Sequence, residues 1–536
     1  MKHTSFKIIH AIGVIIIIAT LSCNKKSLTD LNKNPDVIGF VKPEYSFTAA
    51  VFNSIPGQSY RALGQGLQYF STYKEVPAIG DKFFNFGGTV GNFGVYSGQL
   101  NRLMQLVELI PGDENINKRS ACEILRILAF HQQTDLMGDL PYSESMKGDA
   151  NLKPKYDTQK SIYEAMLTQL ETALLAMNAS KPDVFGNADP YFKGDVAKWK
   201  KFGYTLLLRL GMRLSDVEPT TAKIWVEKAA AGGVMKDFAD IAYIKYANVT
   251  DQMNPRVAGP GSGSLINGDF ASPGGDNVEG SKWSAKFIDH LKNTNDPRLP
   301  VVSVVWTPSG NTYVADNSPA LQRGMLNGSL NTRPSDFNTY SEPSLLYLDR
   351  SSPIITMGPA EAYLLLAEGA LRGWNVGTDA ATAYNNGVRA AMQQWALWPD
   401  VAPHSGVIGE TSIANYLAEN PYLTGEPFAK QLEQISTQKW VSMLGDDYEV
   451  FANWRRTKYP VFRYANWTNP DGSITSYPGN VTGGKMWRRF SLPTSERNVN
   501  NANYLEALQR QHFTEEQQDL LQGRVWWDIG PETGQD

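Results

Sequence analysis

Cysteine is nearly absent from this chain of 536 residues, which contains two. Two thiols cannot build a disulfide framework or a cysteine-ligated zinc site. Histidine is also scarce, and none of the six histidines falls in an H-x-x-H or H-E-x-x-H arrangement, the spacings that place two imidazoles on one metal ion. The sequence therefore predicts no bound metal and no cofactor.

An excess of charge of one sign is lacking as well. The 50 Lys and Arg residues against 54 Asp and Glu leave a formal net charge of −4, so the electrostatic signature of a nucleic-acid-binding protein is missing. Hydrophobic residues make up 42% of the chain, which is enough to bury a sizeable core. Aromatic residues reach 11%, a content typical of proteins that present flat apolar surfaces to ligands.

One long apolar run stands at the N-terminus. It covers residues 8–21 after the basic Lys2 and Lys7, and it is shorter than the roughly 20 residues of a membrane-spanning helix but long enough for a signal-peptide core. The residues Thr20-Leu21-Ser22-Cys23 that end it resemble a bacterial lipobox, in which the cysteine is acylated. We expect a signal peptide over 1–22, then a lipidated Cys23 and a polar tether over 23–43. The alternative is an ordinary secretory signal followed by a chance cysteine.

Helical periodicity dominates the rest of the chain. Apolar residues recur every three or four positions, and Pro, Gly or capping residues bound the segments. The predicted helices cover about 96–110, 121–137, 158–177, 196–214, 359–372, 378–395 and 428–444. Consecutive helices joined by short glycine-containing turns indicate helical hairpins stacked like tetratricopeptide units, hence a mostly α fold.

Two regions interrupt this pattern, residues 248–345 and 465–485, and both are rich in Gly, Pro and Asn. A short β-like run, Val301 to Trp306, lies within the first. Long ordered loops on a rigid scaffold are where binding sites commonly lie. Surface decoration is the alternative interpretation.

Catalytic motifs are missing. The chain has no G-x-S-x-G elbow and no G-x-G-x-x-G fingerprint, and the P-loop-like segment 479–485 is followed by Met486 where a magnesium-binding Ser or Thr is required. We therefore expect no nucleotide site.

Carboxylates that could serve a glycosidase are present. Glu361 and Glu368 lie seven residues apart on one predicted helix face, and Asp446, Asp447 and Glu449 cluster after another helix. Helix caps and solvated helix faces explain these residues more simply, and we expect a protein that is not an enzyme.

Several short motifs are informative about the family of the chain when they are taken together in their order along the sequence. Residues 134–144 read TDLMGDLPYSE. Further motifs occupy 121–130, 155–159, 194–199, 208–214, 295–299, 364–368, 438–440, 454–456 and 488–493. Together they resemble the SusD/RagB family of outer-membrane lipoproteins, in particular the branch with a T-D-x-x-G-D-x-P-Y-S-E signature, over about residues 29–527.

The resemblance implies one SusD-like domain over 44–536, with tetratricopeptide-like helix pairs on one side and a loop-rich ligand-binding face on the other. It also implies a function: a lipid-anchored protein at the cell surface of the outer membrane that binds oligosaccharides and delivers them to a SusC-like TonB-dependent transporter. Peptide binding, as in RagB-like members, is an alternative, and glycoside hydrolysis is a weaker one. The motif residues themselves are interpreted as fold determinants. Gly138 and Pro141 would form a tight turn that Asp139 caps, and Trp199 and Arg209 would lie on a scaffold helix.

The family's ligand face corresponds here to residues 73–96 and 260–345. The candidate contacts are the aromatic residues that lie off any helical stripe. They are Phe83, Phe84, Phe86, Trp306, Tyr313 and Tyr340, with Trp283 nearby. Trp306 meets a predicted turn at 307–310, so we expect its ring to face solvent, and Tyr313 and Tyr340 lie among asparagines that supply polar edges. Core packing is the alternative for each ring, and it is favoured for Phe83 and Phe84.

Overall fold

A computed structural model describes most of the chain. The described residues are 42–56, 60–74, 93–147, 150–258, 265, 270, 280–327, 333–401, 404–462, 467–468, 474–475, 482, 486–515 and 521–530. The predicted signal peptide, Cys23, and the candidates Phe83, Phe84 and Phe86 lie outside these residues.

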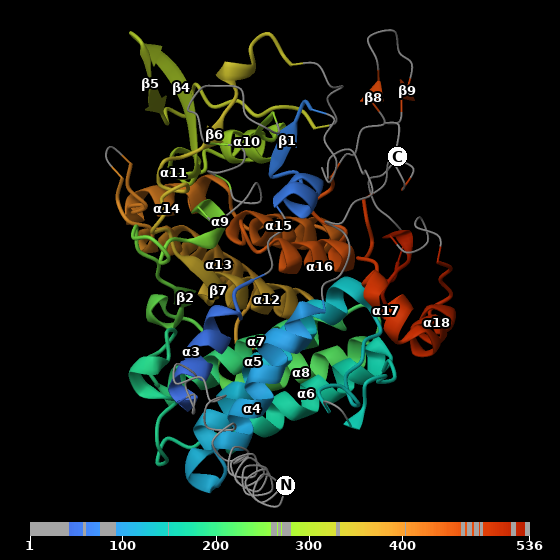
Figure 1. The fold of residues 1–536 in the computed structure, drawn as a ribbon. Coiled ribbons are helices and arrows are strands. Elements are labelled where there is room, and N and C mark those ends of the chain that lie inside the picture. Colours follow the sequence, from blue (N-terminus) through green and yellow to red (C-terminus); the bar gives the residue numbers. More distant parts are fainter. Residues whose placement is uncertain are drawn as a thin grey trace, which may run out of the picture.

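Helices form most of the molecule (Figure 1). The longer ones are α3 (Pro43–Phe52), α4 (Asn101–Leu109), α5 (Ile116–Met137), α6 (Gln159–Ala176), α7 (Val196–Arg213), α8 (Pro219–Gly232), α10 (Ala285–Asn293), α12 (Pro359–Leu371), α13 (Ala380–Gln393), α14 (Glu410–Glu419), α15 (Phe428–Ser442), α16 (Asp447–Thr457) and α18 (Asn501–Arg510). Short ones are α9 (Pro255–Ala258), α11 (Leu299–Val302) and α17 (Thr494–Val499). Within the described part of the chain, every helix is too short or too polar to cross a lipid bilayer.

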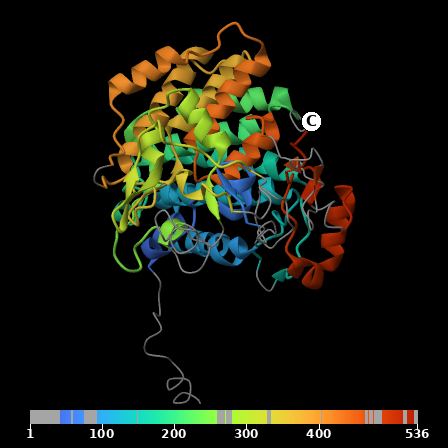
Figure 2. The same cartoon turned by 90° about the horizontal axis from the view of Figure 1, so that it is seen from above.

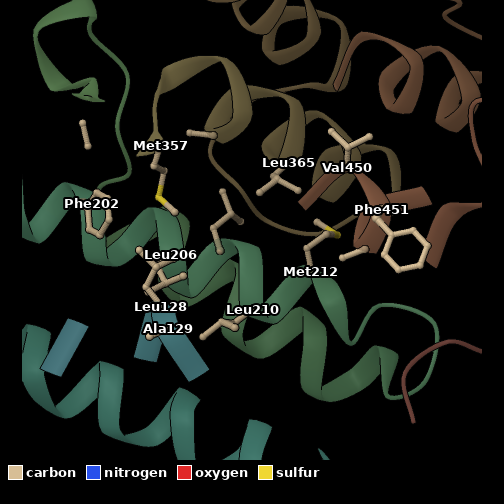
Figure 3. Close-up of a cluster of buried hydrophobic side chains, with 14 of the residues drawn as sticks. Leu128, Ala129, Phe202, Leu206, Leu210, Met212, Met357, Leu365, Val450 and Phe451 are labelled. Atoms are coloured by element: carbon tan, nitrogen blue, oxygen red, sulfur yellow. The ribbon is translucent and has the colours of Figure 1, made fainter. Parts of the chain in front are cut away.

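Consecutive helices pack as pairs, as the sequence predicts: α5 with α6, α7 with α8, and α12 with α13. Figure 1 shows α4–α8 at one end of the molecule, α12–α16 in the middle, and most strands at the other end, while α17 and α18 lie along one edge in Figure 2. A cluster of apolar side chains lies between the first two groups (Figure 3). It includes Leu128, Phe202, Leu206, Leu365 and Phe451, each no more than 2% exposed.

The predicted helix starts are confirmed at two positions. The Thr158 hydroxyl accepts a hydrogen bond from the Ser161 N–H at the start of α6, and the Asp195 carboxylate accepts one from the Lys198 N–H at the start of α7. Both residues pair a backbone donor that the helix itself leaves unpaired.

The TDLMGDLPYSE motif does hold the fold together. Gly138 ends α5 with a φ of +85°, a conformation that favours glycine. We predicted that Asp139 caps this turn, but its carboxylate bonds elsewhere. It accepts a hydrogen bond from the Gln159 N–H (2.8 Å), in the first turn of α6, and another from the Arg510 guanidinium (2.7 Å). The motif therefore joins α5, α6 and α18.

The strands form small antiparallel sheets. They are β1 (Phe70–Thr72) with β3 (Ser281–Trp283), β2 (Ala242–Ile244) with β7 (Ile354–Met357), β8 (Trp467–Thr468) with β9 (Ile474–Thr475), and the three-stranded sheet β5 (Thr312–Asp316), β4 (Ser303–Ser309) and β6 (Glu342–Pro343). Gly310, with a φ of +61°, and Asn311 form the two-residue turn between β4 and β5.

The prediction of a β-like run from Val301 to Trp306 is wrong for its first two residues. Residues up to Val302 belong to the short helix α11, and the strand begins at Ser303. Pro300 accounts for the difference, because its fixed φ suits the first turn of a helix. The same region, predicted as loops, also holds α10, whose first turn is capped by the Ser284 hydroxyl.

Six charged residues form what we call the buried charge network. They are Asp135 on α5, Arg209 and Arg213 on α7, Glu361 on α12, Lys439 on α15 and Glu449 on α16, each at most 4% exposed. Arg209 pairs with Glu361 (2.5 Å), Arg213 with Asp135 (3.1 Å) and with Glu449, and Lys439 with Glu449 (2.8 Å). Burial alone would raise the pKa of Glu449, but the three neighbouring cations outweigh it and hold that pKa well below its usual range.

The sequence led us to expect Glu361 and Glu368 on a solvated helix face. That expectation is wrong, because both side chains are buried. Glu368 is 2% exposed and accepts two hydrogen bonds from Arg456, at 2.5 and 2.6 Å, which join α12 to α16. Burial opposes its ionisation, but Arg456 and Arg372 lower the pKa of Glu368 to about 2.

Replacing Glu368 tests this ion pair. Glu368→Gln should lower the free energy of unfolding at pH 7 by about 3 kcal/mol, because the buried Arg456 and the partly buried Arg372 lose their carboxylate. Since the folded pKa of about 2 lies below the ordinary 4.5, the stabilisation is present above pH 4.5 and is lost as the pH falls towards 2. Urea titrations at several pH values measure it.

Glu164→Gln is the matched control, since Glu164 is exposed and lies 3.6 Å from Lys160 on the helix surface. It should change stability by less than about 0.5 kcal/mol. A Glu368→Gln loss as small as that of the control would contradict the assignment.

Candidate ligand-binding site

Trp283 lies in the core and not on a ligand face. Its ring is 0% exposed and stacks on Phe70, with ring centres 4.3 Å apart. Its indole N–H donates to the Val302 carbonyl (3.2 Å). No ligand can reach the ring in this conformation, so the structure shows the alternative interpretation, core packing.

The prediction that the Trp306 ring faces solvent is wrong. Trp306 is 9% exposed, and its indole N–H donates to the Glu342 carboxylate (2.9 Å). The physical reason is that β4 continues to Ser309 and is the central strand of its sheet, so the turn follows three residues later than the sequence indicated. Trp306 therefore packs against β6.

Among the predicted residues that the structure describes, Tyr313 and Tyr340 reach the surface. Tyr313 lies on the edge strand β5, opposite Pro308, and is 42% exposed. Tyr340 is half-buried and packs on a small apolar cluster formed by Tyr73, Met325 and Phe337. Both rings thus belong to the strand-rich end of the molecule in Figure 1.

Arg323 fixes the Tyr340 ring. Its guanidinium lies 4.3 Å from the ring centre and donates to the Tyr340 hydroxyl (2.8 Å) and to the Asp336 carboxylate (2.6 Å). Partial burial raises the pKa of Tyr340, and the nearby guanidinium only partly opposes that shift. A ring held in one orientation loses little conformational entropy when a ligand binds.

Further polar groups surround the apolar cluster. The Arg333 guanidinium lies 4.9 Å from the Phe337 ring centre and donates to the Asn338 amide oxygen (2.9 Å). On the buried side, the Lys282 ammonium lies 4.3 Å from the same ring and pairs with Glu342. We call Arg323, Arg333, Asn338 and Tyr340 the Tyr340 platform; Tyr313 lies apart from it, on the β4–β5 hairpin.

Sequence reasoning missed the two arginines, Asp336 and Phe337. All four lie in the predicted ligand region, but Arg323 and Asp336 are 13 residues apart, so no helix or strand spacing indicates that they pair. An arginine near an aromatic residue in a loop was the one available signal, and it is a weak one.

One group of residues could in principle hold a metal ion in the part of the chain that the structure describes. Possible ligand atoms of His131, Asp135 and Glu449 lie within 4.8 Å of one another. Arg209, Arg213 and Lys439 already contact these carboxylates, so the site carries compensating positive charge. Burial would lower the pKa of His131, but the two carboxylates outweigh it and raise that pKa.

The described helices form a scaffold of helical pairs, and aromatic and arginine side chains lie on the loops at its strand-rich end. The chain belongs to the SusD-like family, because the family model, described as starch-binding and associating with the outer membrane, matches residues 46–478. A search of curated protein sequences gives no match.

Solved structures resemble the chain over nearly its whole length. A chitin-binding protein is 27% identical, with a TM-score of 0.73, and the match covers 91% of this chain and all of that one. A SusD-like protein of Bacteroidetes AC2a is 23% identical, with a TM-score of 0.73 and the same coverage. A chitin-binding SusD homologue from Flavobacterium johnsoniae is 23% identical, with a TM-score of 0.70, and the match covers 91% of this chain and 99% of that one.

The structural role of Trp306 gives a test. Trp306→Phe removes the donor to Glu342, and the unfolding free energy should fall by about 1–3 kcal/mol, since a buried carboxylate loses a hydrogen bond. Chemical denaturation measures the change. Trp225→Phe is the matched control, because Trp225 is half-buried and its indole makes no hydrogen bond to any described residue. Equal losses in both variants would contradict the role of the hydrogen bond.

Proposed function

We propose that this protein binds a glycan at the Tyr340 platform and has no catalytic activity. The observation that carries the proposal is the Tyr340 ring, half-buried and held by Arg323, with Tyr313 exposed in the same region. A sugar ring places its C–H groups on an aromatic face, and its hydroxyl groups form hydrogen bonds with groups at the edge. Arg323, Arg333 and Asn338 are such groups. The similarity to two chitin-binding proteins supports a polysaccharide fragment as the ligand.

A hydrolase needs two carboxyl groups beside the ligand. At the platform, Asp336 accepts a hydrogen bond from Arg323, and Glu342 is 2% exposed and bound by Lys282 and Trp306. Neither is positioned to protonate or attack a substrate, so binding without hydrolysis is the simpler function. Peptide binding remains the second candidate.

Affinity measurements on two variants test the platform. Tyr340→Ala and Tyr313→Ala should each weaken binding of a chitin or starch hexasaccharide, by about thirtyfold if the ring is a hot spot, because an aromatic anchor is lost. Isothermal titration measures the dissociation constants, with a pool of short peptides as the competing ligand class.

Tyr45→Ala is the control, since Tyr45 is 66% exposed on α3, in the helical part of the molecule. Parent-like affinity in both tyrosine variants would place the site elsewhere. Saturable binding of peptides and not of either saccharide would favour the second candidate.

We also propose that Cys23 is acylated, that the protein faces the cell surface, and that it delivers its ligand to a SusC-like TonB-dependent transporter. The lipobox-like sequence at 20–23 and the description of the family as associated with the outer membrane support this placement. A tethered partner needs less contact area, because the membrane raises its effective concentration.

Isolation from detergent-solubilised outer membranes tests the anchor and the partner together. The parent should carry fatty acid at Cys23, detectable by mass spectrometry, and should co-purify with a TonB-dependent transporter. Cys23→Ala should lose both, because the chains that hold it in the membrane contribute about 0.8 kcal/mol per buried CH₂. A parent without fatty acid, or recovered without transporter, would contradict the corresponding half of the proposal.

A further inference from the structure

A groove runs along helices α4 and α5, at the end of the molecule opposite the strand-rich end (Figure 1). Two cavities form it, with volumes of about 360 and 210 Å³, and they are neighbours because Met104 and Arg126 line both. We call them together the α4–α5 groove. Its main lining residues are Leu103, Met104 and Val107 on α4, and Cys122, Arg126 and Phe130 on α5.

Helical spacing brings these residues to one face of each helix. On α4, Val107 follows the other two lining residues by three and four positions, and on α5 the lining residues are four positions apart. Residues at these spacings are neighbours on a helix surface. Since a helix rises about 1.5 Å per residue, the α5 side of the groove is about 12 Å long, which is about two helical turns.

The floor of the groove is apolar and its edges are adaptable. Leu103 and Cys122 are each 1% exposed, while Met104 and Met146 are half-buried at the edges. Methionine side chains adjust to different partners and are frequent at binding surfaces. A cavity of about 150 Å³ holds one benzene ring, so the two cavities together have room for about three apolar side chains.

Arg126 makes the groove unsuitable for a sugar. Its guanidinium lies 5.5 Å from the Phe130 ring centre and 5.3 Å from the Tyr142 ring centre. These rings are 1% and 8% exposed, so neither offers the open aromatic face on which a sugar ring packs. The remaining lining is aliphatic or thioether carbon, which suits the apolar side chains of a protein.

The charged groups leave one carboxylate without a partner. Both oxygens of Glu123 accept hydrogen bonds from Arg126, at 2.6 and 2.8 Å, so these two charges cancel. Glu108 lines the same cavity, is exposed, and pairs with no residue that the structure describes. This end of the groove therefore carries an excess of negative charge and is complementary to a basic side chain.

The arrangement of the walls fits a helix. The α5 face lies between α4 on one side and Gln169 of α6 on the other, so a helix placed on α5 would occupy the position of one more helix of the scaffold. Amphipathic helices bind such grooves through apolar residues at positions i, i+4 and i+7. Those residues span about 10 Å, which matches the length of the groove.

We propose that the α4–α5 groove binds an amphipathic helix of a partner protein, which places its apolar face between α4 and α6 and a Lys or Arg side chain against Glu108. The bound helix leaves the Tyr340 platform uncovered, because α4 and α5 lie at the other end of the molecule from β6, next to Tyr340 (Figure 1). The proposal does not depend on glycan binding at the platform, since the two sites share no side chain.

Titration with designed peptides tests the groove on the full-length protein. The probe is an end-blocked, fluorescently labelled helical peptide of about 16 residues, with Leu at i, i+4 and i+7 spacing and Lys at each end of the Leu face. We expect saturation with a dissociation constant below about 0.1 mM by fluorescence anisotropy. The same composition in scrambled order should not saturate, because its Leu residues no longer share a face.

Two variants assign the binding to the groove. Glu108→Lys should weaken the Lys peptide by about fivefold, the effect of one exposed ion pair, and should strengthen binding of a peptide with Glu in place of Lys. Val107→Glu should weaken both peptides by at least about tenfold, since it places a charge in the apolar cavity. Both side chains are half-buried or exposed, so the melting temperature should change little.

Glu506→Lys is the matched control, because Glu506 is exposed on α18, and it should leave both affinities unchanged, as should Tyr340→Ala. The proposal is overturned if the Lys peptide does not saturate, if the scrambled peptide binds as well, or if Glu108→Lys has no more effect than Glu506→Lys. A dimer of the parent that Val107→Glu dissociates would assign the groove to a second copy of the chain. Adsorption to phosphatidylcholine vesicles that Val107→Glu abolishes would assign it to a lipid surface, and either result would also overturn the proposal.

Discussion

The packing of the helices depends on the buried charge network of Asp135, Arg209, Arg213, Glu361, Lys439 and Glu449. Each ion costs several kcal/mol to remove from water, and only close pairing offsets that cost. The six side chains come from five helices, α5, α7, α12, α15 and α16. A shift of one helix by even a few tenths of a turn would leave a charge unpaired. The network thus requires the two helical groups of Figure 1 to meet in one arrangement.

A column of aromatic rings connects the helical groups to the strand-rich end of the molecule. The Tyr69 ring stacks on Trp440 of α15, and its hydroxyl donates to the Trp440 carbonyl (2.5 Å). Phe287 packs edge-on against both rings, and Trp283 lies beside Phe287. The backbone N–H of Trp283 donates to the Ser341 carbonyl (2.9 Å), next to Tyr340 in the chain. Trp283, which we predicted to contact the ligand, therefore lies in the core and holds the segment next to Tyr340 in place. The residues around Trp283 in the sequence do not indicate this role.

The sequence predicted what depends on local spacing. Helices α5, α6, α7, α12, α13 and α15 follow from apolar periodicity and caps, and they begin and end within a few residues of the expected positions. The sequence-based prediction failed where the partner of a residue lies far along the chain. Glu368 pairs with Arg456, 88 residues away, and Trp306 with Glu342, 36 residues away. Local spacing predicts that a carboxylate on a helix is solvent-exposed and that a tryptophan at a strand end has no partner. The distant partner of each residue becomes apparent only in the folded structure.

The aromatic content of the sequence suggests ligand surfaces, but several of the rings lie against buried arginines. The Arg455 guanidinium lies 4.0 Å from the Phe451 ring centre and 4.7 Å from that of Trp527. Burial lowers the pKa of Arg455 to about 9, and the negative faces of the two rings partly replace the lost water. Arg323 and Tyr340 make the same contact at the surface. Exposure alone separates a packing pair from a candidate ligand platform, and exposure is a property of the assembled fold, which no spacing of residues encodes.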